Sequence, residues 1–336
     1  MQFRSCAVVL ALGLVPVAVS TSAPQNPPPT PAPQAQSPAP AQGNQAPVAQ
    51  TPETTFSVDV SAMTISVTVV DDKGKSVGGL TQEDFVLEED GQRRPITGFR
   101  AVTEKTENRV PVGLGLVLDA SGSMTQDRLD AMRTAVDFLI NKRLSKEDQV
   151  YFVEFAAAPR MVVPWTTNKN EILNQVRRIK TRDGTGIYDA IAAALPVSKQ
   201  GKAKKQVMLV ITDGADTTSK TNRQQLTDMA RASEVIIYAL VCEGEERVGS
   251  RGGSNNVRQQ ALELAQVTDV TGGRTKHVRG FQELENAISD FGKEFTTQYE
   301  ISFERTAGKD GKFHPIRVGV RRQNVTVRHK VGYVSN

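Results

Sequence analysis

The stretch that decides the fold is Val112-Gly-Leu-Gly-Leu-Val-Leu-Asp119-Ala-Ser121-Gly-Ser123. Its first seven residues form a short apolar run that is typical of a buried strand. Asp119, Ser121 and Ser123 follow at alternate positions, so we expect them in the loop at the carboxyl end of that strand. Open α/β sheets bind ligands in such loops, and three short oxygen side chains suit a hard divalent cation. The same residues also fit a Ser/Gly turn in which Asp119 caps the next helix. Only the rest of the sequence distinguishes this turn from a cation-binding loop.

The chain from about Val110 to Phe295 alternates strand and helix patterns. Further short apolar runs predict buried strands at 150–155, 207–211 and 235–241. Between them, apolar residues recur at steps of three and four, which predicts helices. The expected helix faces carry Leu129, Met132, Val136 and Leu139, then Ile187 and Ile191, then Leu226 and Met229, then Leu262 and Leu264, then Leu284, Ile288 and Phe291. This alternation predicts a doubly wound α/β domain with a mainly parallel sheet.

Antiparallel β patterns flank this domain on both sides. Residues 54–106 and 298–336 alternate apolar and polar positions, and Asp90-Gly91 marks a hairpin turn. We expect the two segments to pair into a small β-sandwich-like domain that holds the α/β domain as an insertion. Acids in the first segment suggest calcium only weakly, because such residues are more often solvated turn acids: Asp71, Asp72, Glu88, Glu89 and Asp90.

The N-terminal region differs in composition from the rest. Arg4 and the apolar stretch 6–19 predict a secretory signal peptide over residues 1–23, although an uncleaved anchor fits the same pattern. Residues 24–53 hold ten of the 17 prolines and no charge before Glu53, so we expect a disordered linker, either a spacer or a passive tail. The expected segments are 1–23, 24–53, a β module at 54–106, the α/β domain at 107–297 and a β segment at 298–336.

Composition and missing motifs exclude several classes of function. The net charge is +4, without a long basic run, so nucleic-acid binding is not indicated. Cys242 would be the sole cysteine of the mature chain, which rules out an internal disulfide there. The sequence lacks a Gly-x-Ser-x-Gly elbow and a His-Glu-x-x-His motif. We therefore expect a protein that is not an enzyme and that has no membrane span in its mature chain.

Two later motifs favour a cation site. Gly184-Thr185-Gly186 opens a predicted helix, and Asp213 follows the apolar run 207–211. Because the carboxyl ends of parallel strands meet at one edge of a sheet, these positions can converge. The candidate metal ligands are Asp119, Ser121, Ser123, Thr185 and Asp213.

These residues, in this order, resemble the metal-ion-dependent adhesion site of the von Willebrand factor type A domain, over roughly Val110 to Phe295. The flanking phrases Gly79-Leu80-Thr-Gln-Glu-Asp84-Phe85 and Gly332-Tyr333 are similar to those of bacterial exported proteins built around this domain. The resemblance implies that Ser121, Ser123 and Thr185 bind Mg²⁺ directly and that Asp119 and Asp213 bind it largely through water. It also implies that Mn²⁺ or Ca²⁺ can substitute.

The function that the resemblance implies is metal-dependent binding of a protein partner that presents an Asp or Glu. The predicted signal peptide implies export to the periplasm, the cell envelope or the exterior. A structural envelope protein whose ion only stabilises the fold is the alternative, and the sequence does not separate the two. It also leaves the partner and the oligomeric state open, along with the roles of Asp216 and Trp165.

Overall fold

The computed structural model describes residues 62–335 except 103–108, 244–252, 297 and 307. The predicted signal peptide and the Pro-rich linker lie outside these described residues. No helix among the described residues is both long and apolar enough to cross a membrane.

A six-stranded sheet forms the centre of the α/β part, with the strand order β10-β9-β8-β5-β6-β7. All neighbouring strands are parallel except β7, which runs antiparallel to β6. The strands are β5 (Val112–Asp119), β6 (Gln149–Phe155), β7 (Pro159–Thr166), β8 (Lys205–Thr212), β9 (Val235–Glu243) and β10 (Arg274–Arg279). This mainly parallel, doubly wound sheet confirms the predicted fold class.

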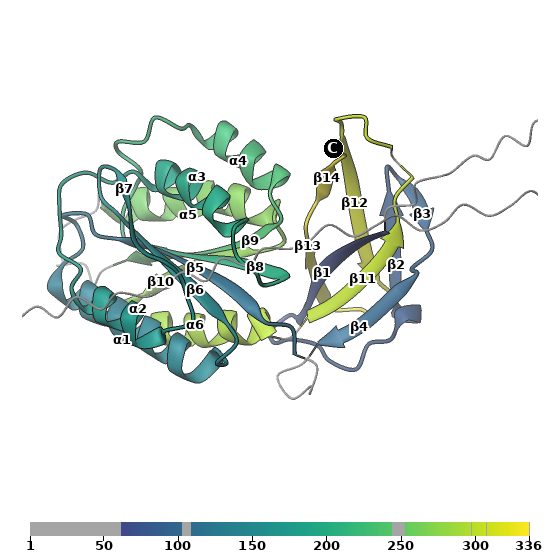
Figure 1. Cartoon of the computed structure of the whole chain (residues 1–336), viewed down its shortest axis with the longest axis horizontal. Coiled ribbons are helices and arrows are strands. Elements are labelled where there is room, and N and C mark those ends of the chain that lie inside the picture. Colours follow the sequence, from purple (N-terminus) through teal and green to yellow (C-terminus); the bar gives the residue numbers. More distant parts are fainter. Residues whose placement is uncertain (1–61, 103–108, 244–252, 297, 307, 336) are drawn as a thin grey trace, which may run out of the picture. The chain divides into compact units, whose positions relative to one another are not determined.

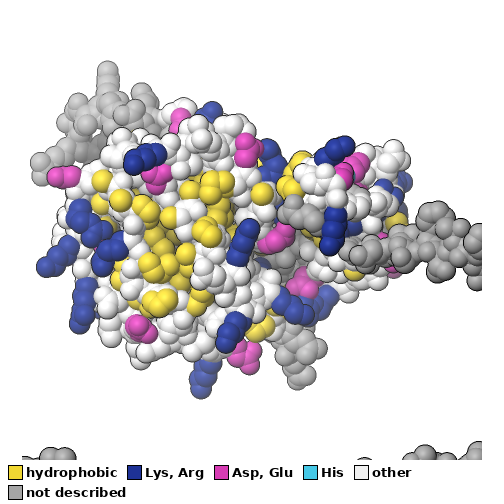
Figure 2. Space-filling view, turned by 45° about the horizontal axis from the view of Figure 1, so that its top comes forward, with side chains coloured by type: hydrophobic (Ala, Val, Ile, Leu, Met, Phe, Trp, Pro, Cys, Tyr) yellow, Lys and Arg dark blue, Asp and Glu magenta, His cyan; other side chains and the backbone are white. Residues whose placement is uncertain are grey.

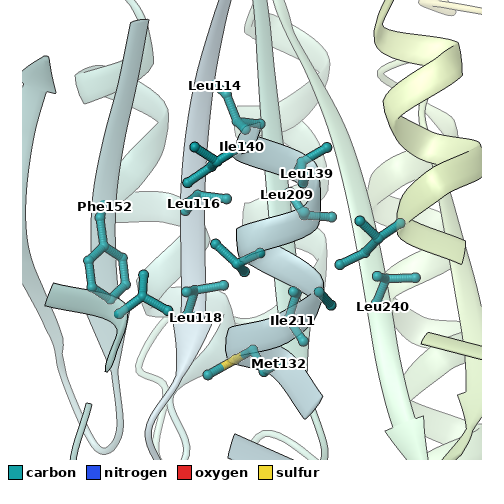
Figure 3. Close-up of a cluster of buried hydrophobic side chains, with 14 of the residues drawn as sticks. Leu114, Leu116, Leu118, Met132, Leu139, Ile140, Phe152, Leu209, Ile211 and Leu240 are labelled. Carbon is teal, nitrogen blue, oxygen red and sulfur yellow. The ribbon is translucent and has the colours of Figure 1, made fainter. Parts of the chain in front are cut away.

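Helices cover both faces of the sheet (Figure 1). One face packs against α1 (Gln126–Arg143), α2 (Lys169–Arg177) and α6 (Gly280–Thr296), and the other against α3 (Ile187–Ser198), α4 (Arg223–Ala232) and α5 (Gly253–Asp269). Because side chains alternate along a strand, Leu114, Leu116 and Leu118 of β5 face α1, whereas Val117 faces α3. Figure 3 shows the three leucines beside Met132, Leu139 and Ile140 of α1. Burial on both faces explains why the central strands are continuous apolar runs.

Strands from both sides of the α/β part form two four-stranded antiparallel sheets, in the orders β13-β1-β11-β4 and β14-β12-β2-β3. In the first sheet, β1 pairs with both β11 and β13, and in the second, β2 pairs with β12. Their shared core includes Val67, Leu87, Tyr299, Ile301 and Phe303. The elements are β1 (Ala62–Asp71), the short helix η1 (Gln82–Asp84), β2 (Phe85–Glu89), β3 (Gln92–Arg94), β4 (Gly98–Val102), β11 (Gln298–Glu304), β12 (Phe313–Val320), β13 (Val325–His329) and β14 (Gly332–Val334).

Some of the expectations about individual elements and residues were wrong or incomplete. The apolar-run criterion missed β7 and β10, which are rich in polar residues or proline. The helix α2 was also missed, although Ile172, Leu173 and Val176 form a buried face at helical spacing. Met229 and Leu262 were expected on core-facing helix sides, but both are exposed, while Leu226 and Leu264 are buried. Glu89 was expected to be a solvated turn acid, and it is instead fully buried.

Candidate functional site

Asp119 and Thr212 end the adjacent parallel strands β5 and β8, whose register pairs Leu118 with Ile211. The Thr212 hydroxyl donates to Asp119 Oδ2 (2.6 Å), and the Ser121 backbone N–H donates to Asp119 Oδ1 (2.7 Å). The register of two strands therefore places the first candidate ligand, and hydrogen bonds fix both of its carboxylate oxygens.

The chain of polar contacts continues to Asp213. The Ser121 and Ser123 hydroxyl oxygens lie 2.9 Å apart, and the Ser123 hydroxyl donates to Asp213 Oδ1 (2.6 Å). Since Asp213 follows Thr212 directly, the contacts close a ring that contains Asp119, Ser121, Ser123 and Asp213. Four of the five candidate ligands therefore lie together at the carboxyl edge of the sheet.

Thr185 is held close to this edge by its backbone. Its carbonyl accepts from the N–H groups of Thr217 (2.8 Å) and Thr218 (3.2 Å), in the loop that begins at Asp213. Nearby, the Arg182 N–H donates to the Ala120 carbonyl (2.8 Å) between the first two ligands of the ring. Thr185 is buried, and among the described residues its hydroxyl has no hydrogen bond to the ring. The backbone contacts thus hold Thr185 near the site, but its hydroxyl takes no part in the hydrogen bonds of the ring.

Burial dominates the electrostatics of the ring. It raises the pKa of Asp119 to about 6, although hydrogen bonds from Ser121 and Thr212 act in the opposite direction. The negative charge of Asp213 raises this pKa further. A buried carboxylate with a raised pKa is short of compensating positive charge, which a cation would supply.

Arg128 contacts the ring from the first turns of α1. One of its guanidinium nitrogens, Nη1, pairs with Asp213 Oδ2 and also donates to the Ser123 carbonyl (3.0 Å). The Arg128 side chain is 30% exposed, whereas the Asp213 side chain is fully buried. The sequence reasoning missed Arg128. The sequence did contain a signal for Arg128. A basic residue near a helix N-terminus is unfavourable with respect to the helix dipole, so its presence there indicates a specific contact.

The donor set fits a hard divalent cation. It combines two carboxylates with the hydroxyls of Ser121, Ser123 and Thr185, all oxygen ligands of the kind Mg²⁺ takes. No group of three or more His, Cys, Asp or Glu in the part of the chain that the structure describes is arranged to hold a metal ion. The acidic residues around Asp90 therefore do not form such a group.

The structure gives Asp216 and Asp189 positions in the loop framework. Asp216 accepts from the Tyr188 N–H at the start of α3 (3.0 Å) and from the Ser219 hydroxyl (2.6 Å). Asp189 accepts from the N–H groups of Lys220 and Thr221. Both acids hold the loop after Asp213 against α3, so neither is a freely solvated loop acid.

Trp165 and Cys242 contribute to packing. Trp165 packs edge-on against Tyr151 with ring centroids 4.6 Å apart, and its indole N–H donates to the Val197 carbonyl. It lies at the end of β7 that pairs with the start of β6, away from Asp119. Cys242 packs partly buried against the core, and burial raises the pKa of its thiol to about 12. A buried thiol with a raised pKa contributes to packing and is a poor nucleophile at neutral pH.

The fold and the ring together define a class: an open α/β domain with an acid–hydroxyl cluster at the carboxyl edge of its sheet. Comparison with known families narrows this class, because residues 114–215 match the family model of the von Willebrand factor type A domain. The matched stretch runs from β5 to the loop after Asp213, and the α/β part has the fold of this domain.

Individual relatives cover only parts of the molecule. An uncharacterized protein of Borreliella burgdorferi is 26% identical over 205 residues, which cover 55% of this chain and 59% of the relative. The inter alpha-trypsin inhibitor heavy chain 4 of Mus musculus is 31% identical over 140 residues, which cover 38% and 15%. A solved von Willebrand factor type A structure from Catenulispora acidiphila is 13% identical with a TM-score of 0.48, covering 75% of this chain and 74% of its own. The chain thus spans less than two thirds of the two sequence relatives.

Proposed function

We propose that this protein binds a divalent cation, Mg²⁺ in the first place, at Asp119, Ser121, Ser123, Thr185 and Asp213, and uses it to bind a protein partner. The observation that carries the proposal is the ring of hydrogen bonds that joins two carboxylates and two serine hydroxyls from separate strand ends. The match to the von Willebrand factor type A domain over the same residues supports it.

In this proposal the hydroxyls of Ser121, Ser123 and Thr185 ligate the ion directly. Asp119 and Asp213 balance its charge, largely through water, as Mg²⁺ favours because it dehydrates reluctantly. The bound ion would supply an electrophilic position for a carboxylate. The partner would therefore present an Asp or Glu to the carboxyl edge of the sheet.

We further propose that the protein acts outside the cytoplasm and is not an enzyme. The N-terminal pattern of residues 1–23 supports export. The acids and hydroxyls of the site are hydrogen-bonded to one another. In this proposal each of them serves as a ligand of the cation. The proposed role is thus that of an exported interaction module.

The test combines thermal stability with partner capture. Since a ligand that binds the native state stabilises it, 1 mM Mg²⁺ should raise the Tm of the full chain by several degrees relative to EDTA. Asp213→Asn should abolish the rise. Asp228→Asn, at an exposed acid on α4 that pairs with Arg231, should retain it.

Capture from an envelope extract should likewise require both Mg²⁺ and Asp213. A Tm rise without Mg²⁺-dependent capture would assign the ion to stability alone. A Tm that is the same in Mg²⁺, Mn²⁺, Ca²⁺ and EDTA would overturn the cation site itself.

A further inference from the structure

Two arginines share one buried carboxylate beside the proposed cation site. Glu154 lies near the end of β6, where the register places it opposite Leu118, one residue before Asp119. Its Oε1 accepts from Arg160 Nη2 (2.7 Å) and Nε (3.0 Å) and lies 2.6 Å from Arg182 Nη2. Two guanidinium groups thus face a single carboxylate, which cannot accept from all of their N–H donors.

Backbone hydrogen bonds fix these arginines next to the ring. Arg182 forms a parallel bridge with Ser121, and its N–H donates to the Ala120 carbonyl. Arg160 lies on β7 directly opposite Glu154. Both side chains therefore lie at the carboxyl edge, because the Arg182 backbone bridges Ser121 and Arg160 pairs with Glu154, one residue before the end of β6.

Much of each guanidinium remains available to a partner. The Arg160 side chain is 60% exposed and that of Arg182 is 44% exposed, while Glu154 is buried. Each guanidinium has five N–H donors in a planar fork, and the contacts to Glu154 use only some of them. Figure 2 shows Lys and Arg side chains gathered along the left edge of the α/β part in that view. Exposed donors of this kind suit a second carboxylate, because Arg binds carboxylates with specific, charge-assisted geometry.

We propose that Arg160 and Arg182 make the carboxyl edge a two-point receptor for an acidic peptide segment of a partner protein. One carboxylate of that segment ligates the cation, and a second pairs with the two arginines. The inference rests on the proposed function and adds that the partner carries clustered acids and not a lone Asp or Glu. Charge complementarity of this kind contributes specificity and association rate.

The experiment uses two dye-labelled nonapeptides, one with a single Glu among Gly and Ser and one with three Glu at alternate positions. Fluorescence polarisation measures the Kd of each for the full chain in 1 mM Mg²⁺ and in EDTA. We expect the three-Glu peptide to bind about tenfold more tightly than the single-Glu peptide, which corresponds to one additional charge-assisted contact. Binding of both should require Mg²⁺.

The decisive variant is Glu154→Gln/Arg160→Gln/Arg182→Gln. It removes the buried charge together with its partners, so that no uncompensated carboxylate remains. This variant should lose the tenfold preference and keep the Mg²⁺-dependent rise in Tm. The matched control is Arg177→Gln/Arg231→Gln, at side chains 61% and 34% exposed on α2 and α4, and it should retain the preference.

The outcomes separate the two proposals. If Mg²⁺ raises the Tm but both peptides bind equally, or neither binds, the receptor inference is wrong while the cation site stands. If the triple variant keeps the preference, the arginines do not cause it. If trigalacturonate, which carries its carboxylates on sugars, competes as well as the three-Glu peptide, the assignment to a peptide is overturned. If the Tm does not respond to a divalent cation, the proposed function fails first.

Discussion

Two buried carboxylates, one in the β part and one in the α/β part, have pKa values shifted in opposite directions. In the β part, Glu89 accepts from Arg94 Nε (2.9 Å), the Thr306 hydroxyl (2.7 Å), the Thr306 N–H (3.4 Å) and the Tyr333 hydroxyl (2.6 Å). Burial alone would raise its pKa, but these hydrogen bonds and the charge of Arg94 outweigh burial and lower the pKa. In the α/β part, two donors do not offset burial at Asp119, and its pKa rises to about 6.

Under the proposed function, this difference separates a structural acid, Glu89, from a cation-binding acid, Asp119. Glu89 has its full set of partners within the chain, so its charge is already compensated where it stands. Asp119 has two donors and lies near a second carboxylate, Asp213, which pairs with the partly exposed Arg128. Buried acids that lack sufficient donors are costly in free energy, which supports the cation that we propose beside Asp119.

The largest effect is expected from Glu89→Ala. This change leaves Arg94, Thr306 and the buried Tyr333 hydroxyl without their acceptor, so it should lower the free energy of unfolding by about 3 kcal/mol. Urea unfolding followed by circular dichroism measures this. Glu88→Ala, at the next position of β2, is the control and should change the value by less than about 0.5 kcal/mol.

The Glu89 prediction also tests the contrast itself. The variant should retain the Mg²⁺-dependent rise in Tm, because no contact of Glu89 reaches the ring. If Glu89→Ala were as stable as Glu88→Ala, the classification of Glu89 as a structural acid would be wrong.

The sequence predicted the sheet and four ring residues because both follow from local pattern. Buried strands are apolar runs, and the residues that follow parallel strands meet at one edge. The missed strands, β7 and β10, lack this pattern. In β10, for example, Val278 is the sole fully buried residue among Arg274–Arg279. Edge elements need little apolar surface, so hydropathy does not reveal them.

Long-range partners were beyond prediction for a different reason. Glu89 is buried because Thr306 and Tyr333 reach it from 217 and 244 residues away, and a turn acid has the same local sequence. Similarly, the contact of Arg128 with Asp213 depends on the direction in which α1 follows the loop. The contact of Arg182 with Glu154 depends on the backbone bridge between Arg182 and Ser121. Such partners require the packing of whole elements, and single-sequence patterns carry no information about it.

A smaller effect is expected from Arg128→Gln. Arg128 and a cation compete for Asp213, so removing the guanidinium should tighten Mg²⁺ binding by about threefold, the equivalent of roughly 0.6 kcal/mol for a partly exposed ion pair. Isothermal titration calorimetry measures the Kd. Arg133→Gln, which breaks the Arg133–Asp130 pair one turn further along α1, should leave it unchanged. Weaker Mg²⁺ binding in Arg128→Gln would instead mean that Arg128 supports the occupied site.

The smallest effect concerns protons in the β part. His314 Nδ1 lies 2.8 Å from Asp90, its Nε2 lies 3.2 Å from Asp310, and its ring stacks on Tyr333. The hydrogen bond to Asp90 is the main reason that the pKa of His314 is raised above 6.5. Because the folded state binds this proton more tightly, the stabilisation is fully present below the unfolded pKa and is lost as the pH rises through the folded pKa.

The Tm difference between the parent chain and His314→Gln should therefore shrink between pH 5.5 and 8.5. Asp90→Asn removes the principal cause of the shift and should flatten this dependence, and Asn tolerates the positive φ of 52° at that position. In 1 mM Mg²⁺ the Tm difference between the parent chain and His314→Gln should show the same pH dependence, since the titration of Asp119 near pH 6 affects both proteins equally and cancels in the difference. If adding Mg²⁺ changes the pH dependence of this difference, the two regions are coupled, and the contrast between the self-compensated β part and the proposed cation site no longer holds.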